Sequence, residues 1–126
     1  MRKENREQKR NEATWNELEA VPNRYQDRNY TVDISIPEFT CVCPRTGLPD
    51  FATIEIHYVP DKLLVELKSL KYYILNYRNM GIFHEDVTNR ILDDVRAAIQ
   101  PREIVVTGDF HPRGGIKTVV TSRWPE

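Results

Sequence analysis

The stretch that decides the fold is Tyr30-Thr-Val-Asp-Ile-Ser-Ile-Pro-Glu-Phe-Thr-Cys-Val-Cys43, followed after a turn by Phe51-Ala-Thr-Ile-Glu-Ile-His-Tyr58. Apolar and polar residues alternate in both segments, which is the pattern of strands with one buried face. Between them, Pro44-Arg-Thr-Gly-Leu-Pro49 is rich in the residues that favour turns. The pattern therefore predicts a β-hairpin with an elaborate tip.

Two amphipathic helices are predicted after this hairpin. Apolar residues recur at three- and four-residue steps over Leu63–Met80, and Gly81 stands where a helix commonly ends. A second stripe runs through His84–Gln100 and stops at Pro101. The residues expected to face the core are Leu67, Leu70, Ile74 and Tyr77 in the first helix and Val87, Ile91, Val95 and Ala98 in the second.

Two further strands, Glu103–Phe110 and Ile116–Arg123, are predicted on either side of the turn Pro112-Arg-Gly-Gly115. The element order ββααββ predicts an α+β fold with one antiparallel sheet and two helices on one of its faces. Residues 17–126 are expected to form a single domain, with Leu18–Asn23 as a lead-in segment, after a polar arm at residues 1–16. Because strands this long leave bare edges, pairing with neighbouring subunits in a homo-oligomer is expected.

Composition limits the classes of function. With 18 basic and 19 acidic residues, the 126-residue chain has a net charge of −1, which argues against a nucleic-acid-binding domain. The apolar runs are too short to cross a bilayer, and the first ten residues contain no apolar segment of a secretory signal. A disulfide between the near neighbours Cys41 and Cys43 would be strained. Reduced thiols in a cytoplasmic protein without membrane or nucleic-acid partners are therefore expected.

The hairpin tip holds the densest group of reactive residues. A free thiol has a pKa of about 8.5, so a few per cent is thiolate at neutral pH, and that fraction is already a good nucleophile. Cys43 stands at the loop margin, where an electrophile can reach it, and Asp50 lies across the loop as a candidate proton donor and acceptor. Cys41 is expected to pack as a small apolar residue. The alternative is that both thiols are inert and that Asp50 only forms a turn.

Three further groups suit ligand binding, each with a simpler alternative. Lys68 and Lys71 share a face of the first helix and suit a phosphate, or form an ordinary solvated surface. Glu85 can accept two hydrogen bonds from a guanine-type edge, or only complement the dipole of the second helix. Arg113 and Gly114 offer a guanidinium and an unshielded backbone N–H to a phosphate, although one turn is a weak signal.

Neither a metal site nor a familiar nucleotide fold is predicted. The Cys-x-Cys spacing is poor for structural zinc, and no second pair accompanies it. No Gly-x-Gly-x-x-Gly follows a strand, and there is no Walker-type loop. A nucleotide cofactor would therefore be held outside a Rossmann domain.

Taken in order, these motifs resemble the short, single-module form of the NADPH-dependent 7-cyano-7-deazaguanine (preQ0) reductases, the nitrile reductases of queuosine biosynthesis, a tRNA modification. The resemblance runs from Leu18 to Arg123. Its most specific parts are Phe39-Thr-Cys-Val-Cys-Pro44 with Gly47-Leu-Pro-Asp-Phe-Ala-Thr53, Glu66-Leu-Lys-Ser-Leu-Lys-Tyr72, Tyr77-Arg-Asn79, Phe83-His-Glu85 and Pro112-Arg-Gly-Gly115. The resemblance implies the tunnelling fold, in which ββααββ subunits join their sheets into a barrel with active sites between subunits, here as a decamer of two pentamers.

The resemblance also implies roles for individual residues. Cys43 is implied to be the nucleophile and Asp50 the general acid and base. The residues implied to bind the preQ0 base are Val65, Glu66, Leu67, His84 and Glu85. Those implied to lie near NADPH are Lys68, Arg113 and Gly114, with Lys71 as a looser assignment. Cys43 would form a thioimide with the nitrile, which two NADPH molecules would reduce in turn to the amine preQ1.

Two other readings of the same motifs stay open. One is a zinc-dependent, pterin-forming enzyme of the tunnelling fold, and the other is a non-catalytic binding module on that fold. Some members of the resembled family have a partner cysteine for a protective disulfide near the start of the second helix. Val87 occupies that position here, which leaves Cys41 as the other candidate for this part.

Overall fold

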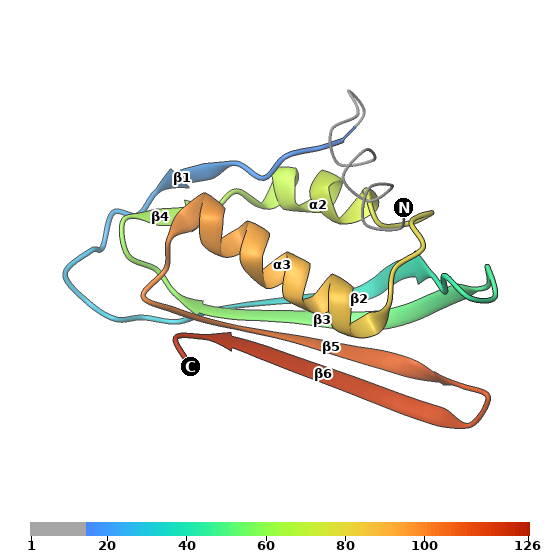
Figure 1. Cartoon of the computed structure of the whole chain (residues 1–126). Coiled ribbons are helices and arrows are strands. Elements are labelled where there is room, and N and C mark those ends of the chain that lie inside the picture. Colours follow the sequence, from blue (N-terminus) through green and yellow to red (C-terminus); the bar gives the residue numbers. More distant parts are fainter. Residues whose placement is uncertain (1–14) are drawn as a thin grey trace.

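The computed structural model describes residues 15–126 (Figure 1). The elements are β1 (Ala20–Pro22), β2 (Val32–Val42), β3 (Pro49–Val59), β4 (Leu63–Val65), α2 (Leu67–Leu75), α3 (His84–Ile99), β5 (Glu103–Arg113) and β6 (Ile116–Trp124). The polar arm predicted at residues 1–16 falls almost wholly outside the described residues. The first described side chain, Trp15, packs edge-on against Tyr73 and Tyr77, as expected of an anchor for the start of the domain.

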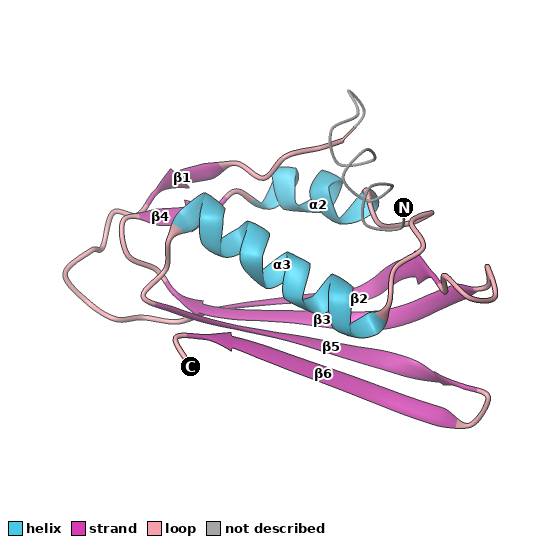
Figure 2. Cartoon of the chain, in the orientation of Figure 1, coloured by secondary structure: helices cyan, strands magenta, loops and turns pink. Residues whose placement is uncertain are grey.

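The four long strands form one antiparallel sheet in the order β2-β3-β5-β6, and both helices lie on the same side of it (Figure 2). Alternate residues of the two central strands face the helices and are buried: Ala52, Ile54, Ile56, Tyr58, Ile104, Val106 and Phe110. The α+β fold predicted from the alternating pattern is thus confirmed. Burial of each large apolar side chain contributes about 1.5–3 kcal/mol, so this layer dominates the stability of the domain.

The first predicted helix is wrong at its start. Leu63–Val65 is a strand, β4, which pairs with β1 in a separate two-stranded sheet, so the expected lead-in segment is partly a strand as well. The Tyr58 hydroxyl accepts a hydrogen bond from the Val65 backbone N–H at 3.2 Å and ties this sheet to β3. Glu66 then begins the helix, because its carboxylate caps the backbone N–H groups of Lys68 and Ser69.

The same helix also ends earlier than predicted, at Leu75. From Asn76 onward the backbone N–H groups bond to carbonyls three residues back, which is the tighter turn common at helix ends. Gly81 is not its C-terminal residue but forms a bridge with Val42. Leu67 was expected in the core and is instead 61% exposed.

The second predicted helix agrees closely with α3. Gln100 takes the left-handed conformation (φ 48°) and ends it immediately before Pro101. Val87, Ile91 and Val95 are fully buried, as expected. Ala98 is only partly buried, because Ile99 occupies the core position there.

The outer strands of the four-stranded sheet are β2 and β6. Within residues 15–126, the outer edge of β6 is unpaired, and that of β2 is unpaired except at Val42, which bridges Gly81. Their free edges are where the predicted joining of sheets between subunits would occur. That assembly stays a prediction. No helix among the described residues is long and apolar enough to span a membrane.

Candidate active site

The β2–β3 hairpin and the β5–β6 hairpin turn at the same end of the sheet, and α3 starts there too (Figure 1). In the register of the first hairpin, Cys41 lies opposite Asp50, and Cys43 follows the last residue of β2. Arg113 ends β5, and His84 is the first residue of α3. The fold therefore gathers residues from four elements at one end of the sheet.

The carboxylate of Asp50 is the centre of this group. Its side chain is only 6% exposed and has two partners: the Nη1 of Arg113 donates to Oδ1 at 2.5 Å, and the Nε2 of His84 lies 3.1 Å from Oδ2. The His84 ring is stacked on Phe110, with the centroids 3.8 Å apart and the planes 6° from parallel. Stacking thus holds the His84 ring beside Asp50, and Arg113 pairs with the other carboxylate oxygen.

The two thiols have opposite electrostatic environments. The Thr46 hydroxyl lowers the pKa of Cys43 to about 7, helped by the backbone N–H groups of Arg45 and Thr46 and, more weakly, by Arg113, while burial opposes them. The Cys43 side chain is only 6% exposed in the single chain, so it is not open at the loop margin as expected from the sequence. Burial raises the pKa of Cys41 to about 12, and the nearby Asp50 carboxylate acts in the same direction. The lowered pKa favours the thiolate of Cys43 near neutral pH, whereas Cys41 stays protonated. This separation supports the different roles predicted for them.

Other predicted site residues lie elsewhere in the chain's fold. Val65 is buried in β4, and Leu67 and Lys68 are exposed at the start of α2, which lies beside β4 rather than beside the hairpin tips (Figure 1). Lys71 is exposed one turn further along. Glu85 is exposed in the first turn of α3, next to His84 in sequence.

Glu66 has a structural role that the sequence motif did not reveal. Its two carboxylate oxygens accept the backbone N–H groups of Ser69 at 2.7 Å and of Lys68 at 3.0 Å, and these bonds lower its pKa. Glu66 and Lys68 also line a polar pocket of about 340 Å³, together with Trp15, Asn16, Glu17, Glu19, Ser69 and Tyr72. Cys43 and Asp50 are not part of that pocket, so one chain alone does not join the two groups of predicted site residues.

Comparison with known proteins identifies the family. The model of the family described as QueF-like protein matches residues 49–126, from β3 to the C-terminal end. The chain belongs to this family. A relative from Chlorobium phaeovibrioides is 64% identical over 105 residues, which cover 83% of this chain and 90% of the relative. Another, from Thermomicrobium roseum, is 58% identical over 108 residues, covering 86% of this chain and 84% of the relative. Both are named NADPH-dependent 7-cyano-7-deazaguanine reductase.

A solved structure extends this result to the fold. The crystal structure of the archaeosine synthase QueF-Like in the apo form matches with a TM-score of 0.70 and 24% identity, over 74% of this chain and 91% of that chain. At this identity the likeness concerns the fold alone. The fold expected from the resemblance, and membership of the QueF-like family, are therefore confirmed.

The residues predicted to hold a phosphorylated cofactor lie on two separate surfaces of the chain, on α2 and at the end of β5. Lys68 and Lys71 are exposed cations, and the Arg113 side chain is 42% exposed despite its contact with Asp50. Gly114 has φ +62°, and no atom lies within 4 Å of the place where a Cβ would stand, so a ligand can approach the backbone closely. Within residues 15–126, no three His, Cys, Asp or Glu side chains gather closely enough to hold a metal ion.

Two residues of the QueF-like site were not singled out from the sequence. Phe110 was assigned only to a strand, and its stacking under His84 depends on packing between β5 and α3, which no local pattern shows. Thr46 was treated as part of a turn. Its signal was available, because a hydroxyl three residues after a cysteine in a tight turn is well placed to reach the sulfur.

Proposed function

We propose that this chain reduces the nitrile of 7-cyano-7-deazaguanine to a primary amine with NADPH, through a covalent bond to Cys43. The observation that carries the proposal is the meeting of the Cys43 loop, the buried carboxylate of Asp50 and its partners Arg113 and His84 at one end of the sheet. The lowered pKa of the Cys43 thiol supports it. A thiolate is the nucleophile that a nitrile carbon requires, and a proton must reach the nitrile nitrogen at the same time. The names of the closely similar relatives support the same substrate and the same reductant.

The first step follows from the positions of three side chains. The Cys43 sulfur bonds to the nitrile carbon, one C–N π bond breaks, and the nitrogen takes up a proton to give a thioimide. Asp50 stands beside Cys43, and its contact with the His84 ring provides the route by which that proton is replaced. The stacking of His84 on Phe110 keeps the ring in line with Asp50.

From the thioimide, reduction to the amine takes two hydrides and one further proton, so NADPH acts twice as a co-substrate. It supplies the hydride to the former nitrile carbon. Lys68, Lys71, Arg113 and Gly114 would hold its phosphates and ribose. After the first reduction the Cys43 sulfur leaves as a thiolate, which the donors around it can receive without a new proton. Asp50 would then assist protonation of the nitrogen a second time.

The base-binding residues suggest how the site is completed. Val65, Glu66 and Leu67 lie at the start of α2, whereas His84 and Glu85 lie with Cys43 at the hairpin end (Figure 1). Both groups meet one substrate if a neighbouring subunit brings its α2 to the Cys43 site. The free edges of β2 and β6 are suited to that assembly. We propose a homo-oligomer with sites between subunits, a decamer of two pentamers, acting in the cytoplasm, where free thiols persist.

The test measures the intact mass of the protein after incubation with 7-cyano-7-deazaguanine in the absence of NADPH. An increase equal to the mass of the substrate is expected, and NADPH should then release it with two NADPH oxidised per substrate. The Cys43→Ala variant should show no adduct and no turnover. The matched control is Cys41→Ala, which should retain both. An adduct that persists in Cys43→Ala, or oxidation of NADPH without any adduct, would contradict the covalent route.

A further inference from the structure

The start of α3 lies against β5, and two pairs of residues make the contact. His84 stacks on Phe110, with the ring centroids 3.8 Å apart. Thr88, four residues further along the helix, has its hydroxyl over Gly108, which stands two residues before Phe110 on the strand. Four helical residues rise about 6 Å and two strand residues about 6.7 Å, so the two pairs match in spacing. The start of α3 therefore has a defined place on β5.

Gly108 has no room for a side chain at this contact. A Cβ at Gly108 would stand 2.5 Å from Thr88 Oγ1 and 2.8 Å from Phe110 Cε1, both closer than real Cβ atoms come. Thr88 and Phe110 are fully buried, so neither has open space to move into. Gly108 does not have a positive φ. Glycine is therefore required here by the space between helix and strand and not by the backbone conformation.

Any side chain at Gly108 would disturb the contact between His84 and Asp50. Ordinary contact with the Thr88 hydroxyl would require the helix to move away from the strand by about 1 Å, or the Phe110 ring to turn. The Nε2 of His84 lies 3.1 Å from Oδ2 of Asp50, near the long end of the hydrogen-bond range, so such a movement breaks this contact. The N-cap residue Phe83 makes no side-chain hydrogen bond to the helix. The position of His84 therefore depends on packing against β5.

We propose that Gly108 is a positioning residue for the reaction, because its missing side chain lets Phe110 and Thr88 hold His84 against Asp50. The Thr88 hydroxyl also donates to the His84 carbonyl at 2.8 Å, which ties the two helix residues together. Gly108 itself is buried and acts only through these neighbours. The proposal rests on the proposed function, since the aligned pair serves the proton that Asp50 gives to the nitrile nitrogen.

The test compares Gly108→Ala with Gly81→Ala as a matched control. A Cβ at Gly81 would lie 3.6 Å from the Pro44 Cα, which is ordinary contact, and Gly81 does not have a positive φ. The same substitution is thus expected to fit at Gly81, close to the Cys43 loop, and to displace its neighbours at Gly108. Circular dichroism establishes that both variants are folded.

The first measurement needs neither NADPH nor the nitrile. Diethyl pyrocarbonate acylates an imidazole nitrogen, and peptide mass spectrometry gives the rate at each histidine. The rate at His84 is taken relative to that at His57, which lies on the other face of the sheet, paired with Asp33. In Gly108→Ala the relative rate at His84 should rise roughly fivefold, because the ring loses a hydrogen bond. In Gly81→Ala it should stay at the wild-type value.

The second measurement separates proton supply from the reactivity of the thiol. Formation of the nitrile adduct without NADPH should fall about tenfold or more in Gly108→Ala, because a displacement of about 1 Å misaligns the proton donor. Alkylation of Cys43 by iodoacetamide should stay within about twofold of wild type, since displacement of iodide by a thiolate needs no proton donor. A general distortion of the fold would change both rates together.

Three results would overturn the proposal: a folded Gly108→Ala with wild-type acylation of His84, faster acylation without loss of adduct formation, or an equal loss of adduct formation and alkylation. If Gly108→Ala does not fold, Phe110→Leu takes its place, with Phe39→Leu as a control at an equally buried ring. Wild-type behaviour in Phe110→Leu would be just as decisive against it. A wild type that forms no nitrile adduct, with His84 acylation still raised in Gly108→Ala, would refute the proposed function and leave Gly108 as the residue that places His84.

Discussion

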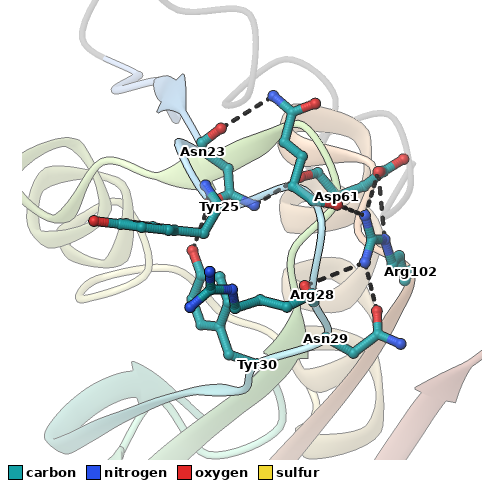
Figure 3. A network of polar contacts seen from close by, with 8 residues as sticks. Asn23, Tyr25, Arg28, Asn29, Tyr30, Asp61 and Arg102 are labelled. Carbon is teal, nitrogen blue, oxygen red and sulfur yellow. Dashed lines mark hydrogen bonds and ion pairs between the residues drawn. The ribbon is translucent and has the colours of Figure 1, made fainter.

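Two arginines near the ends of strands show how differently the same side chain is used. Arg102, just before β5, donates to the carbonyl of Gln26 at 2.7 Å, to Oδ1 of Asn29 at 2.5 Å and to Oδ1 of Asp61 at 3.2 Å (Figure 3). A further bond reaches the Arg28 carbonyl. Most of its partners are neutral groups of the loop between β1 and β2, which Arg102 fixes against the β3–β4 turn.

Arg113, at the other end of β5, has fewer partners, and both can change their charge. It donates to the carboxylate of Asp50, which is 6% exposed, and it helps to lower the pKa of the Cys43 thiol. By contrast, the Asp61 side chain is 43% exposed, so its ion pair with Arg102 is screened by water. We therefore expect Arg102, which holds neutral loop groups, to stabilise the fold, and Arg113, which holds a buried acid, to act on the reaction.

Removal of the Asp50 carboxylate would test the comparison of Arg102 and Arg113 most strongly. Asp50→Asn should lower turnover by about 100-fold or more, because it abolishes both the proton donor and the charged partner of Arg113. Circular dichroism should show the native fold, and alkylation of Cys43 should continue. Turnover within a few fold of wild type would mean that Asp50 is not the acid.

The next effect concerns Arg113. Arg113→Gln should reduce formation of the nitrile adduct roughly tenfold even without NADPH, since it loosens Asp50 and withdraws a donor from Cys43. Its thermal unfolding should stay close to that of the wild type. If only the KM for NADPH changes and the adduct forms at the normal rate, Arg113 serves the cofactor alone.

Arg102→Gln should have the opposite effects to Arg113→Gln: it should lower the stability of the fold and leave formation of the adduct unchanged. We expect a loss of about 1–2 kcal/mol in the free energy of unfolding, because the carbonyls of the loop lose their donor. The adduct should form at the wild-type rate at temperatures where the variant is folded. A catalytic loss as large as that of Arg113→Gln would remove the distinction between the two arginines.

The smallest expected effect separates two roles of Glu66. Glu66→Gln should lower the melting temperature by a few degrees, since a charged cap complements the dipole of α2 better than a neutral one. The folded state lowers the pKa of Glu66, so this carboxylate stabilises the fold above its ordinary pKa of about 4.3 and ceases to do so as the pH falls through the lowered value. Melting curves between pH 3 and pH 7 measure the difference. A large increase in the KM for the nitrile would show that Glu66 also binds the base.

Much of the fold follows from periodicity alone. The alternation in β2 and β3 and the stripe of α3 are long enough to fix both the element type and the buried face. The three residues of β4 are too few to show a period, and their partner β1 lies about 40 positions earlier in the chain. The periodic pattern therefore wrongly assigned Leu63–Val65 to the helix that follows.

The candidate site also has one part that local sequence predicts and another part that it does not. Cys43 and Asp50 belong to one hairpin, so their proximity was predictable from local sequence. The contacts of Asp50 with Arg113 and His84 depend on the register of β3 with β5 and on the packing of α3, which involve residues 63 and 34 positions away. No local pattern contains that information.

The unequal thiols of the first hairpin affect how the protein withstands oxidative stress. A cysteine with a lowered pKa reacts readily with peroxide, so Cys43 is the position at which a sulfenic acid would form. Rescue requires an attacking thiolate, and Cys41, held protonated in the core, is a poor source of one. The position of the alternative partner is occupied by Val87, which has no sulfur. We therefore expect this protein to depend on small thiols such as glutathione, entering from solution, for protection from irreversible oxidation.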